Sequence, residues 1–376
     1  MNHSVSRDAR RRFLKTALAT TGAGLMSTAW PLRLLASDTL RIGFIYVGAR
    51  DDFGYNQAHA EGADSIAQLP WIEVIEQENV PETLEVQKTM QSMITLDNVD
   101  AVFPTSFGYY DPHVKKVAPR FPDVAFLHCG GLYQEGDPGN AGSYFGYIDE
   151  AQYIAGIVAG HSSQRKRLGF VAAKPIPQVL RNINAYTLGA RSVDASITTR
   201  VVFTGGWSDP VREAEATNSL VDQGVDVVTC HVDSPKVIAQ TCAEREIFFT
   251  GYHANQSSLI PAGYLTGAEW NWATVYQQYA QWLRDGARPP SLYRGGLKEA
   301  FVKVSDYGPA VSDAARRHAD GEIASFQAGG KVIFGGGLKD NEGNTVIPAN
   351  EVRPQTDVRL EKMDWLVEGV VGSTGA

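Results

Sequence analysis

The chain has 376 residues, of which 43% are hydrophobic and 20% are charged, and its formal net charge is −8. This length suffices for two domains with sizeable cores, and the composition is ordinary for a globular protein. The acidic balance speaks against nucleic acid as a partner, because phosphate binding calls for clustered Lys and Arg side chains.

The first 37 residues have the pattern of an export signal. The sequence RRRFLK at 10–15 matches a twin-arginine signal, and an apolar, small-residue run follows at 17–30. That run is too short and too rich in Thr and Gly to span a bilayer. The alternative is a basic amphipathic helix. Because no cysteine lies near the signal, we expect no lipid anchor and a mature protein that is free in the periplasm.

Beyond residue 38 the chain alternates strands and helices. Hydrophobic runs predict strands at 40–47, 71–76, 100–104, 124–129, 168–172, 200–204, 225–231 and 246–252. Amphipathic segments between them predict helices that include 82–94, 112–120, 178–193 and 210–223. Such alternation is typical of parallel sheets whose two faces are covered by helices.

The two halves of this pattern are similar. FPDVAFLHCG at 121–130 closes the first series of strands, and GVDVVTCHV at 224–232 forms a comparable strand in the second. We therefore predict an α/β protein with two doubly wound parallel-sheet lobes joined by a hinge. Residues 143–160 would carry the chain into the second lobe, and a strand and helix at 264–286 would return it. The predicted lobe 1 is 38–149 plus 264–296, and lobe 2 is 150–263 plus 297–376.

Aromatic residues follow three of the predicted strands at their carboxyl ends, where open α/β sheets bind ligands. The segments are DDFGYNQAHAEG at 51–62, TSFGYYD at 105–111 and TGGWSD at 204–209. Tyr55, Phe107 and Trp207 are placed to stack on a planar heterocycle, and Asn56 offers a donor and an acceptor to its edge. The alternative is that these rings fill cores between the lobes and that Asn56 caps the following helix.

Catalytic motifs are absent from the sequence. It contains no GxSxG elbow, no HExxH, no Walker loop and no GxGxxG fingerprint, and the glycines at 335–337 indicate a tight turn. No two of the four candidate histidines share a helix at i, i+4 spacing; these are His113, His128, His231 and His253. We therefore predict no catalytic residue, no metal site and no cofactor.

The three cysteines, Cys129, Cys230 and Cys242, lie in or beside apolar runs. An odd number allows at most one internal disulfide and leaves one thiol over. Their spacing matches no zinc motif, so we expect buried structural cysteines.

The segment 51–62 resembles the first loop, DDxSFNQ followed by EG, of the basic membrane protein family of ABC-transporter solute-binding proteins, which includes purine nucleoside receptors. Further matches occur in the family's order: SFGYYD at 106–111, YIAGIVAG at 153–160, GWSDP at 206–210 and DQGVDVV at 222–228. The similarity spans about 40–286. It implies a type I periplasmic binding protein-like fold with three crossovers between lobes. It also implies that the lobes close on a purine, with Phe107 and Trp207 against the two faces of the ring. Tyr55 stands where the family has a stacking Phe, and Asn56 stands where the family has a base-binding Asn.

Two departures from the nucleoside receptors bear on the ligand. Where those receptors carry GVDVDQ, this chain reads GYHANQ at 251–256, so that His253 and Asn255 replace acids suited to ribose hydroxyls. Where they carry a Lys after the next strand, this chain has Trp270, whose bulk would fill the volume of the sugar. The resemblance and these departures favour a free purine base such as adenine or hypoxanthine. The alternative is that His253 and Trp270 pack elsewhere.

We therefore predict a periplasmic solute-binding subunit of an ABC importer, which closes its lobes on a purine base and presents the closed state to a membrane permease. It is expected to be a monomer and not an enzyme. Asn184, on the helix that opens the second lobe, is predicted to meet the base from that side.

Three alternatives remain at this stage. They are a purine nucleoside-binding protein of the same family, a periplasmic sensor subunit and, less favoured, an exported purine-acting hydrolase with Asp51 or Asp52 as its base. A two-lobed sugar-responsive repressor is disfavoured, because the export signal stands where its DNA-binding helices would be.

Overall fold

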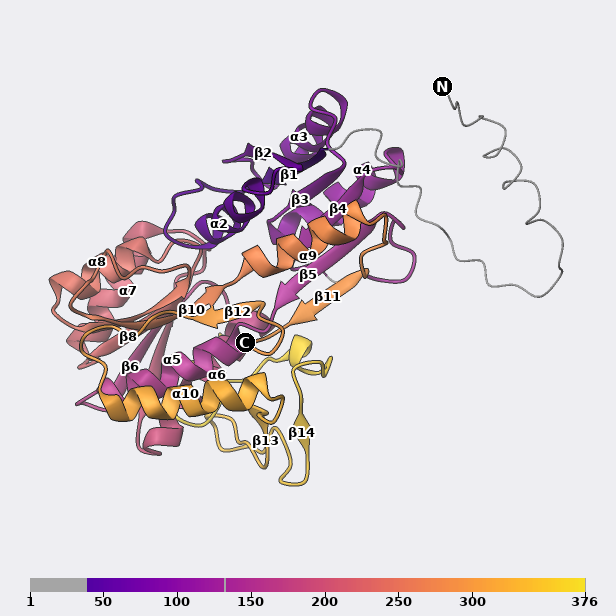
Figure 1. Ribbon diagram of the computed structural model, residues 1–376. Helices are drawn as coiled ribbons and strands as arrows, with labels where there is room; N and C mark the ends of the chain where they lie inside the picture. The colour runs from indigo at the N-terminus through magenta and orange to yellow at the C-terminus, as the bar shows by residue number, and fades with distance from the viewer. Residues whose placement is uncertain (1–38, 132, 376) are drawn as a thin grey trace, which may run out of the picture.

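We describe the computed structural model of the chain over residues 39–131 and 133–375 (Figure 1). The export signal predicted at 1–37 lies outside these residues. None of the helices within them is long and apolar enough to cross a membrane. Figure 1 shows two lobes, with the N-terminal part of the described chain in the upper one.

The first lobe is built on a six-stranded parallel sheet in the order β11-β5-β4-β3-β1-β2. Its strands are β1 (Leu40–Ile45), β2 (Ile72–Gln77), β3 (Ala101–Pro104), β4 (Ala125–Cys129), β5 (Ala141–Gly146) and β11 (Leu292–Gly295). Its helices are α2 (Tyr55–Ala67), α3 (Leu84–Thr95), α4 (Lys115–Val117) and α9 (Trp272–Arg284). Strands β3 and β4 are buried along their whole length, as expected of central strands covered on both faces.

The second lobe is built on a seven-stranded sheet in the order β12-β10-β9-β8-β6-β7-β15, in which only the β10 and β12 pair is antiparallel. Its strands are β6 (Arg167–Ala172), β7 (Thr198–Phe203), β8 (Val227–His231), β9 (Phe248–His253), β10 (Tyr264–Trp270), β12 (Val302–Val304) and β15 (Val370–Val371). Its helices are α5 (Asp149–Ser162), α6 (Pro177–Val193), α7 (Pro210–Asp222), α8 (Lys236–Glu244) and α10 (Asp313–Gln327). The tail adds a small pair of strands, β13 (Phe334–Gly335) and β14 (Val352–Arg353).

This topology confirms the predicted α/β fold with two doubly wound sheets. All eight predicted strands are present, and their ends differ from the prediction by at most two residues. The helix predicted at 112–120 is instead a series of short turns that runs to Arg120. The helix is interrupted because Asp111 has extended backbone angles (φ −115°, ψ 117°) and Pro119 lacks a backbone donor.

The lobes divide at a different place from the one predicted around residue 264. Strand β10, which the sequence assigned to the first lobe, pairs in parallel with β9 of the second, with Ala268 opposite Tyr252. The chain enters the first lobe only after Asn271, where α9 packs against α2. The physical reason is that β10 is buried on both faces, so either sheet could have accepted its hydrophobic pattern.

The chain passes between the lobes three times, from β5 to α5, from β10 to α9 and from β11 to β12. The crossing segments are bonded to each other: Tyr147 N donates to Gly295 O at 2.8 Å and Asn271 N donates to Phe301 O at 2.8 Å. Beside them, Leu297 N donates to Glu150 Oε2 at 2.7 Å. Burial raises the pKa of the Glu150 carboxyl to about 8.

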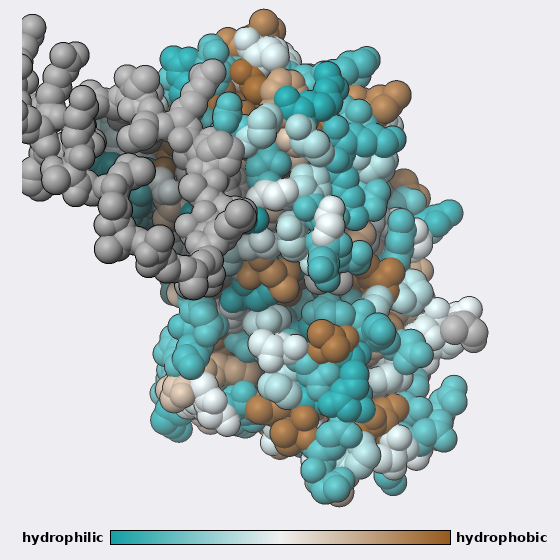
Figure 2. Space-filling view, turned by 90° about the vertical axis from the view of Figure 1, so that its right-hand side faces the viewer, coloured by the Kyte–Doolittle hydropathy of each residue, from teal (hydrophilic) through white to brown (hydrophobic). Residues whose placement is uncertain are grey.

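The side of the molecule that faces right in Figure 1 is turned to the viewer in Figure 2. On the coloured part of that face, hydrophobic residues form small separate patches among hydrophilic ones (Figure 2). Scattered apolar residues of this kind are normal on a protein surface and do not by themselves mark an interface.

Candidate functional site

The loop between β1 and α2 is shaped by Asp52 before it reaches the second lobe. Asp52 Oδ1 accepts hydrogen bonds from Gly54 N and Gln57 N at 2.8 and 2.9 Å, so this carboxylate caps α2. Its other oxygen accepts from the Asn56 side chain at 2.8 Å, and Asn56 Oδ1 in turn accepts from Gly48 N at 3.2 Å. Both polar atoms of Asn56 are therefore engaged within its own lobe.

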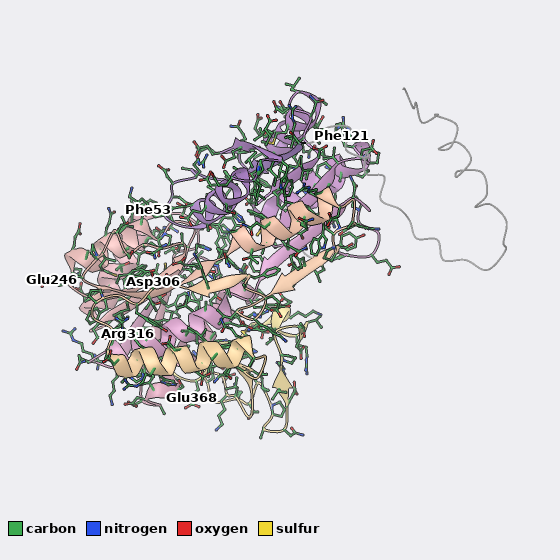
Figure 3. The ribbon with its side chains drawn as sticks, viewed as in Figure 1. Phe53, Phe121, Glu246, Asp306, Arg316 and Glu368 are labelled. Atoms are coloured by element: carbon green, nitrogen blue, oxygen red, sulfur yellow. The ribbon has the colours of Figure 1, made fainter. Side chains whose placement is uncertain are left out.

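The same loop touches the second lobe directly, near Phe53, which is labelled in Figure 3. Three hydrogen bonds cross between the lobes: Tyr55 N to Asp233 O at 2.8 Å, Ser234 Oγ to Asp52 O at 2.6 Å, and Gln256 Nε2 to Phe53 O at 2.6 Å. We call these three bonds the closing contact. Gly54 lies against it, since a Cβ at this position would stand 2.0 Å from the Asp233 carbonyl oxygen. The structure thus has its lobes in contact at this edge of the cleft.

A cavity of about 220 Å³ lies between the lobes behind the closing contact. Five of the seven predicted ligand residues line it, namely Tyr55, Phe107, Trp207, His253 and Trp270. Phe107 comes from the first lobe and is 69% exposed, which leaves its ring free for a further contact. Trp207 comes from the loop after β7 in the second lobe. Aromatic side chains of both lobes therefore line one partly open cavity.

His253 and Trp270 are held together on one wall of this cavity. Trp270 Nε1 donates to His253 Nδ1 at 2.7 Å, so the neutral imidazole carries its proton on Nε2. That nitrogen is buried without a hydrogen-bond partner among the described residues. Burial and the neighbouring histidines lower the His253 pKa well below its usual value, an effect that the Val232 carbonyl partly offsets. His253 is therefore a neutral donor.

The Trp270 ring is fixed by its neighbours. It stacks on Trp272 with a centroid distance of 4.7 Å and an interplanar angle of 14°, and it contacts Phe145 at 5.1 Å. These contacts, together with the bond to His253, leave the indole little freedom to move aside for a bulky group.

Two carboxyl groups that the sequence analysis passed over also line the cavity, Glu82 from the first lobe and Asp233 from the second. Glu82 Oε1 accepts from Gly108 N at 2.8 Å and from the Ser106 hydroxyl. Burial, then the Asp52 and Glu82 charges, raise the pKa of Asp233 to about 8. The available signal was position, because Asp233 stands two residues beyond the end of β8, at the edge of the sheet that also carries Trp207.

Asn184 is not brought to the cavity. Its Oδ1 accepts from Val367 N at 2.7 Å and its Nδ2 donates to Trp365 O at 2.9 Å. The side chain thus holds the C-terminal segment against α6. Its helical neighbour Asn182 is the one that faces the cleft, where its amide donates to His231 Nδ1 at 2.8 Å.

A second cavity of about 390 Å³ adjoins the first. The two share five lining residues, which are Phe107, Gly130, Phe145, Ile176 and Gln178. The second cavity is more polar and contains the buried ion pair of Arg181 with Asp149, at 3.2 Å, and the side chain of Arg294. It offers room for a ligand larger than a single ring system.

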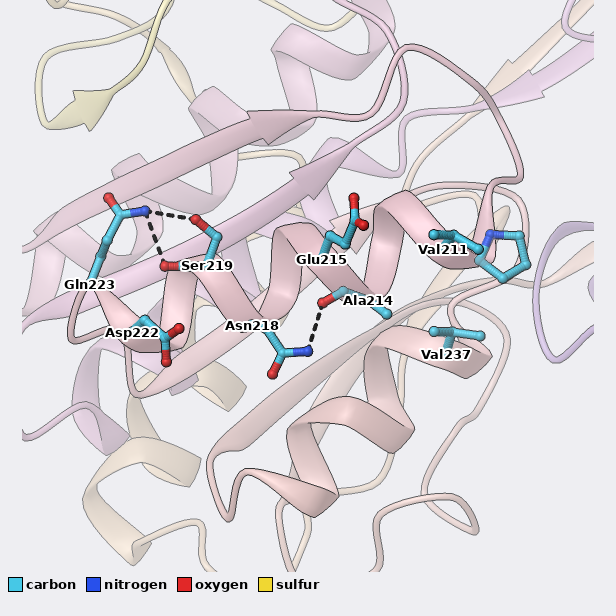
Figure 4. Close-up of a pocket in the computed structure, with 9 residues that line it drawn as sticks. Val211, Ala214, Glu215, Asn218, Ser219, Asp222, Gln223 and Val237 are labelled. Atoms are coloured by element: carbon cyan, nitrogen blue, oxygen red, sulfur yellow. Dashed lines mark hydrogen bonds between the residues drawn. The ribbon is translucent and has the colours of Figure 1, made fainter.

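A groove of about 820 Å³ lies on the outside of the second lobe between α7 and α8 (Figure 4). Its polar side chains already have partners: Gln223 Nε2 donates to Ser219, Asn218 Nδ2 donates to the carbonyl oxygen of Ala214, and Arg245 donates to Asn218 and Asp222. None of the predicted site residues lines it. We therefore place the candidate site in the cleft between the lobes.

The described residues contain no group of three or more His, Cys, Asp or Glu side chains arranged to hold a metal ion. The cysteines at 129, 230 and 242 are buried free thiols, as their apolar surroundings predicted. Burial raises the pKa of the Cys129 thiol, which lines the cavity, to about 12, so the unreactive thiol form dominates there.

Comparison with known proteins decides the family. Residues 39–325 match the model of the ABC transporter substrate-binding proteins described as PnrA-like. The chain belongs to this family. The family membership predicted from the motif at 51–62 and the later motifs is thereby confirmed. As a PnrA-like substrate-binding protein, it binds a small molecule, and the family implies a membrane permease as its partner.

Two relatives share about a third of its sequence. A purine-binding protein of Brucella abortus is 32% identical over 89% of this chain and 94% of its own length. A putative ABC transporter glucose-binding protein of Haloferax volcanii is also 32% identical, over 74% of this chain and 70% of its own. The names of these two relatives therefore point to different ligands, a purine and glucose.

Solved structures share the fold of this PnrA-like protein. An ABC transporter solute-binding protein from Conexibacter woesei matches with a TM-score of 0.66 and 21% identity, over 77% of this chain and 97% of that one. Another from Aeropyrum pernix matches with a TM-score of 0.67 and 19% identity, over 80% and 93%. These likenesses confirm the two-lobed fold of periplasmic solute-binding proteins.

Proposed function

We propose that the protein binds a purine base of the adenine or hypoxanthine kind between its lobes, as the periplasmic substrate-binding subunit of an ABC importer. The observation that carries this proposal is the cavity of about 220 Å³ between the lobes, lined by Phe107 of one lobe and Trp207 of the other. Aromatic rings on two sides suit a planar heterocycle. The volume lies below the roughly 300–1,000 Å³ of pockets for larger ligands and suits one fused ring system.

The edges of such a base would meet polar groups of both lobes. His253 offers a buried N–H donor, and Glu82 and Asp233 offer carboxyl groups. A purine edge alternates donors and acceptors, so this mixture fits a base better than it fits a purely apolar ring. The fixed Trp270 indole fills the side on which the resemblance puts the sugar, which favours a base over a nucleoside.

A purine nucleoside is the second candidate, and the adjoining cavity of about 390 Å³ favours it. A sugar would fit there if the base were bound with its N9 edge toward Gln178 and Phe145, two of the five residues common to both cavities. The name of the Brucella relative, a purine-binding protein, supports a purine without deciding between base and nucleoside.

We also propose export by the twin-arginine pathway without a lipid anchor, and a monomeric protein that performs no catalysis. Ligand binding would stabilise the arrangement in which the closing contact is made, because a ligand in the cavity touches both lobes at once. The closed surface would then be recognised by the permease.

Calorimetry and thermal unfolding with adenine, hypoxanthine, their nucleosides and glucose test this proposal. A ligand at 100 times its Kd stabilises the folded state by about 2.7 kcal/mol, which is easily seen as a rise in Tm. We expect a rise with a free base and a smaller one with its nucleoside. A larger effect of the nucleoside would select the second candidate, and binding of glucose alone would overturn the purine assignment.

A further inference from the structure

The cavity between the lobes has an unbalanced electrostatic lining. It contains two carboxyl groups, those of Glu82 and Asp233, and no Lys or Arg side chain. Its two histidines carry no compensating charge, since burial lowers the His231 pKa to about 3 and the His253 pKa well below its usual value. The lining therefore has two carboxyl groups and no Lys or Arg side chain beside them.

Asp233 is the more exceptional of the two acids, because its carboxyl oxygens receive no hydrogen bond and no ion pair from the described residues. Its backbone is nevertheless held firmly: its N–H donates to Trp207 O at 2.7 Å and its carbonyl accepts from Tyr55 N at 2.8 Å. The Asp233 carboxyl thus faces the cavity from a fixed backbone and can accept a hydrogen bond or pair with a charge that a ligand supplies.

The groups around Asp233 do not supply it. Lys174 is the cation that acts on it, and its Nζ lies 5.7 Å from the centre of the Trp207 ring. The other titratable groups facing Asp233 come from five segments and are acids, neutral histidines or tyrosines: Asp52, Tyr55, Glu82, Glu213, His231, Tyr252 and His253. Acids thus outnumber the single cation.

Aromatic side chains complete the lining of the cavity. Tyr55, Phe107, Phe145, Trp207 and Trp270 all border the same cavity. Carboxyl groups among aromatic faces, without a protein cation, are the surroundings in which proteins bind cations, because the ring quadrupoles and the carboxylates attract the same charge.

We propose that the ligand of this site is a cationic heterocycle, a planar ring with a delocalised positive charge, held between the aromatic faces with Asp233 as its counter-ion. The proposal rests on the proposed function, since it takes the cavity as the ligand site and a flat heterocycle as the ligand. It replaces neutral adenine or hypoxanthine by a ring of similar shape that carries a fixed positive charge or is readily protonated.

Binding of a cationic ligand should change the protonation of Asp233. Because burial raises the pKa of Asp233 to about 8, its carboxyl is mainly protonated at pH 7. A bound cation favours the carboxylate and lowers that pKa, so binding releases a proton at pH 7. Affinity for a cation therefore rises with pH up to about 8 and then levels off.

Three adenine derivatives test the charge class. 7,9-Dimethyladeninium carries a fixed positive charge, 9-methyladenine is the neutral parent, and 2,9-dimethyladenine adds the same methyl group without the charge. We expect the cation to bind roughly 10-fold or more tightly than either neutral compound. Neutral compounds that bind as tightly as the cation would overturn this inference and leave the proposed function standing. No binding by the cation would likewise overturn this inference, whereas the proposed function fails only if unsubstituted adenine and hypoxanthine and their nucleosides also do not bind.

The variant Asp233→Asn tests the counter-ion. It keeps the size of the side chain, so we expect an unchanged fold, a loss of the cation's roughly 10-fold advantage and no proton release. Proton release is measured by calorimetry at pH 7 in buffers that differ in ionisation enthalpy. Glu215→Gln removes an exposed acid of α7 (Figure 4) and serves as the control. The assignment of Asp233 is refuted if D233N keeps both the preference and the proton release of the unmodified protein.

Discussion

Replacing Gly54 by Ala should prevent the lobes from closing while leaving each lobe folded. The added Cβ would stand 2.0 Å from the Asp233 carbonyl oxygen and 2.6 Å from the Pro235 ring, and real Cβ atoms do not approach so closely. The bonds of Gly54 within its own loop, to Asp52 and Ala58, involve only its backbone, so alanine can keep them. The clash is therefore specific to the arrangement with the lobes in contact.

The expected magnitude follows from the closing contact. A hydrogen bond contributes about 0.5–1.5 kcal/mol net, so the loss of all three bonds weakens the closed arrangement by about 1.5–4.5 kcal/mol. At about 1.4 kcal/mol per factor of ten, this amounts to roughly 10- to 1,000-fold. Because the ligand binds the closed arrangement, its apparent affinity falls by a similar factor once that arrangement is a minority.

Calorimetry measures the affinity, and small-angle scattering measures whether ligand still makes the molecule more compact. Gly321→Ala is the matched control, since Gly321 lies in α10, where an added Cβ would meet nothing within 4 Å. We expect the control to bind normally. A G54A protein with normal affinity and normal compaction would show that closure does not depend on this contact.

Three further results are expected. Trp207→Ala should weaken binding of the heterocycle roughly 10- to 100-fold, since stacking of a base is worth about 1–3 kcal/mol; calorimetry checks this, and unchanged affinity would exclude the aromatic sandwich. Glu150→Gln should stabilise the protein by about 2–5 kcal/mol above pH 8 and by little near pH 4.5, because the raised pKa of Glu150 makes its ionisation in the folded protein unfavourable as the pH rises. Urea unfolding at both pH values measures the difference, and an equal effect at both would contradict the raised pKa. Asn184→Leu should lower the free energy of unfolding by about 1–3 kcal/mol, because its bonds to the C-terminal segment are lost, and should leave the ligand affinity intact. A loss of affinity with unchanged stability would instead show that Asn184 contacts the ligand.

The strand ends were predictable because a buried parallel strand produces a short apolar run with few competing interpretations. The same positional rule brought Tyr55, Phe107 and Trp207 together, since carboxyl ends of parallel strands share one edge of each sheet. It applied equally to Asp233, at the end of β8. Attention to aromatic residues alone caused that acid to be passed over.

Other features depended on packing that periodicity does not encode. Asn182 and Asn184 are both buried on α6, but two residues along a helix correspond to a turn of about 200°. The first therefore faces the cleft while the second faces the C-terminal segment. Similarly, β10 has a hydrophobic pattern that suits either sheet, and only its pairing with β9 assigns it to the second lobe.

On the first-lobe side the closing contact uses only main-chain atoms, namely the carbonyl oxygens of Asp52 and Phe53 and the Tyr55 N–H. Every amino acid other than proline provides these atoms. The side chain of Tyr55 can therefore change without loss of the bond that its N–H makes to the second lobe. Substitutions of Tyr55, which lines the cavity, should accordingly alter which molecule is bound while the movement that closes the lobes is retained.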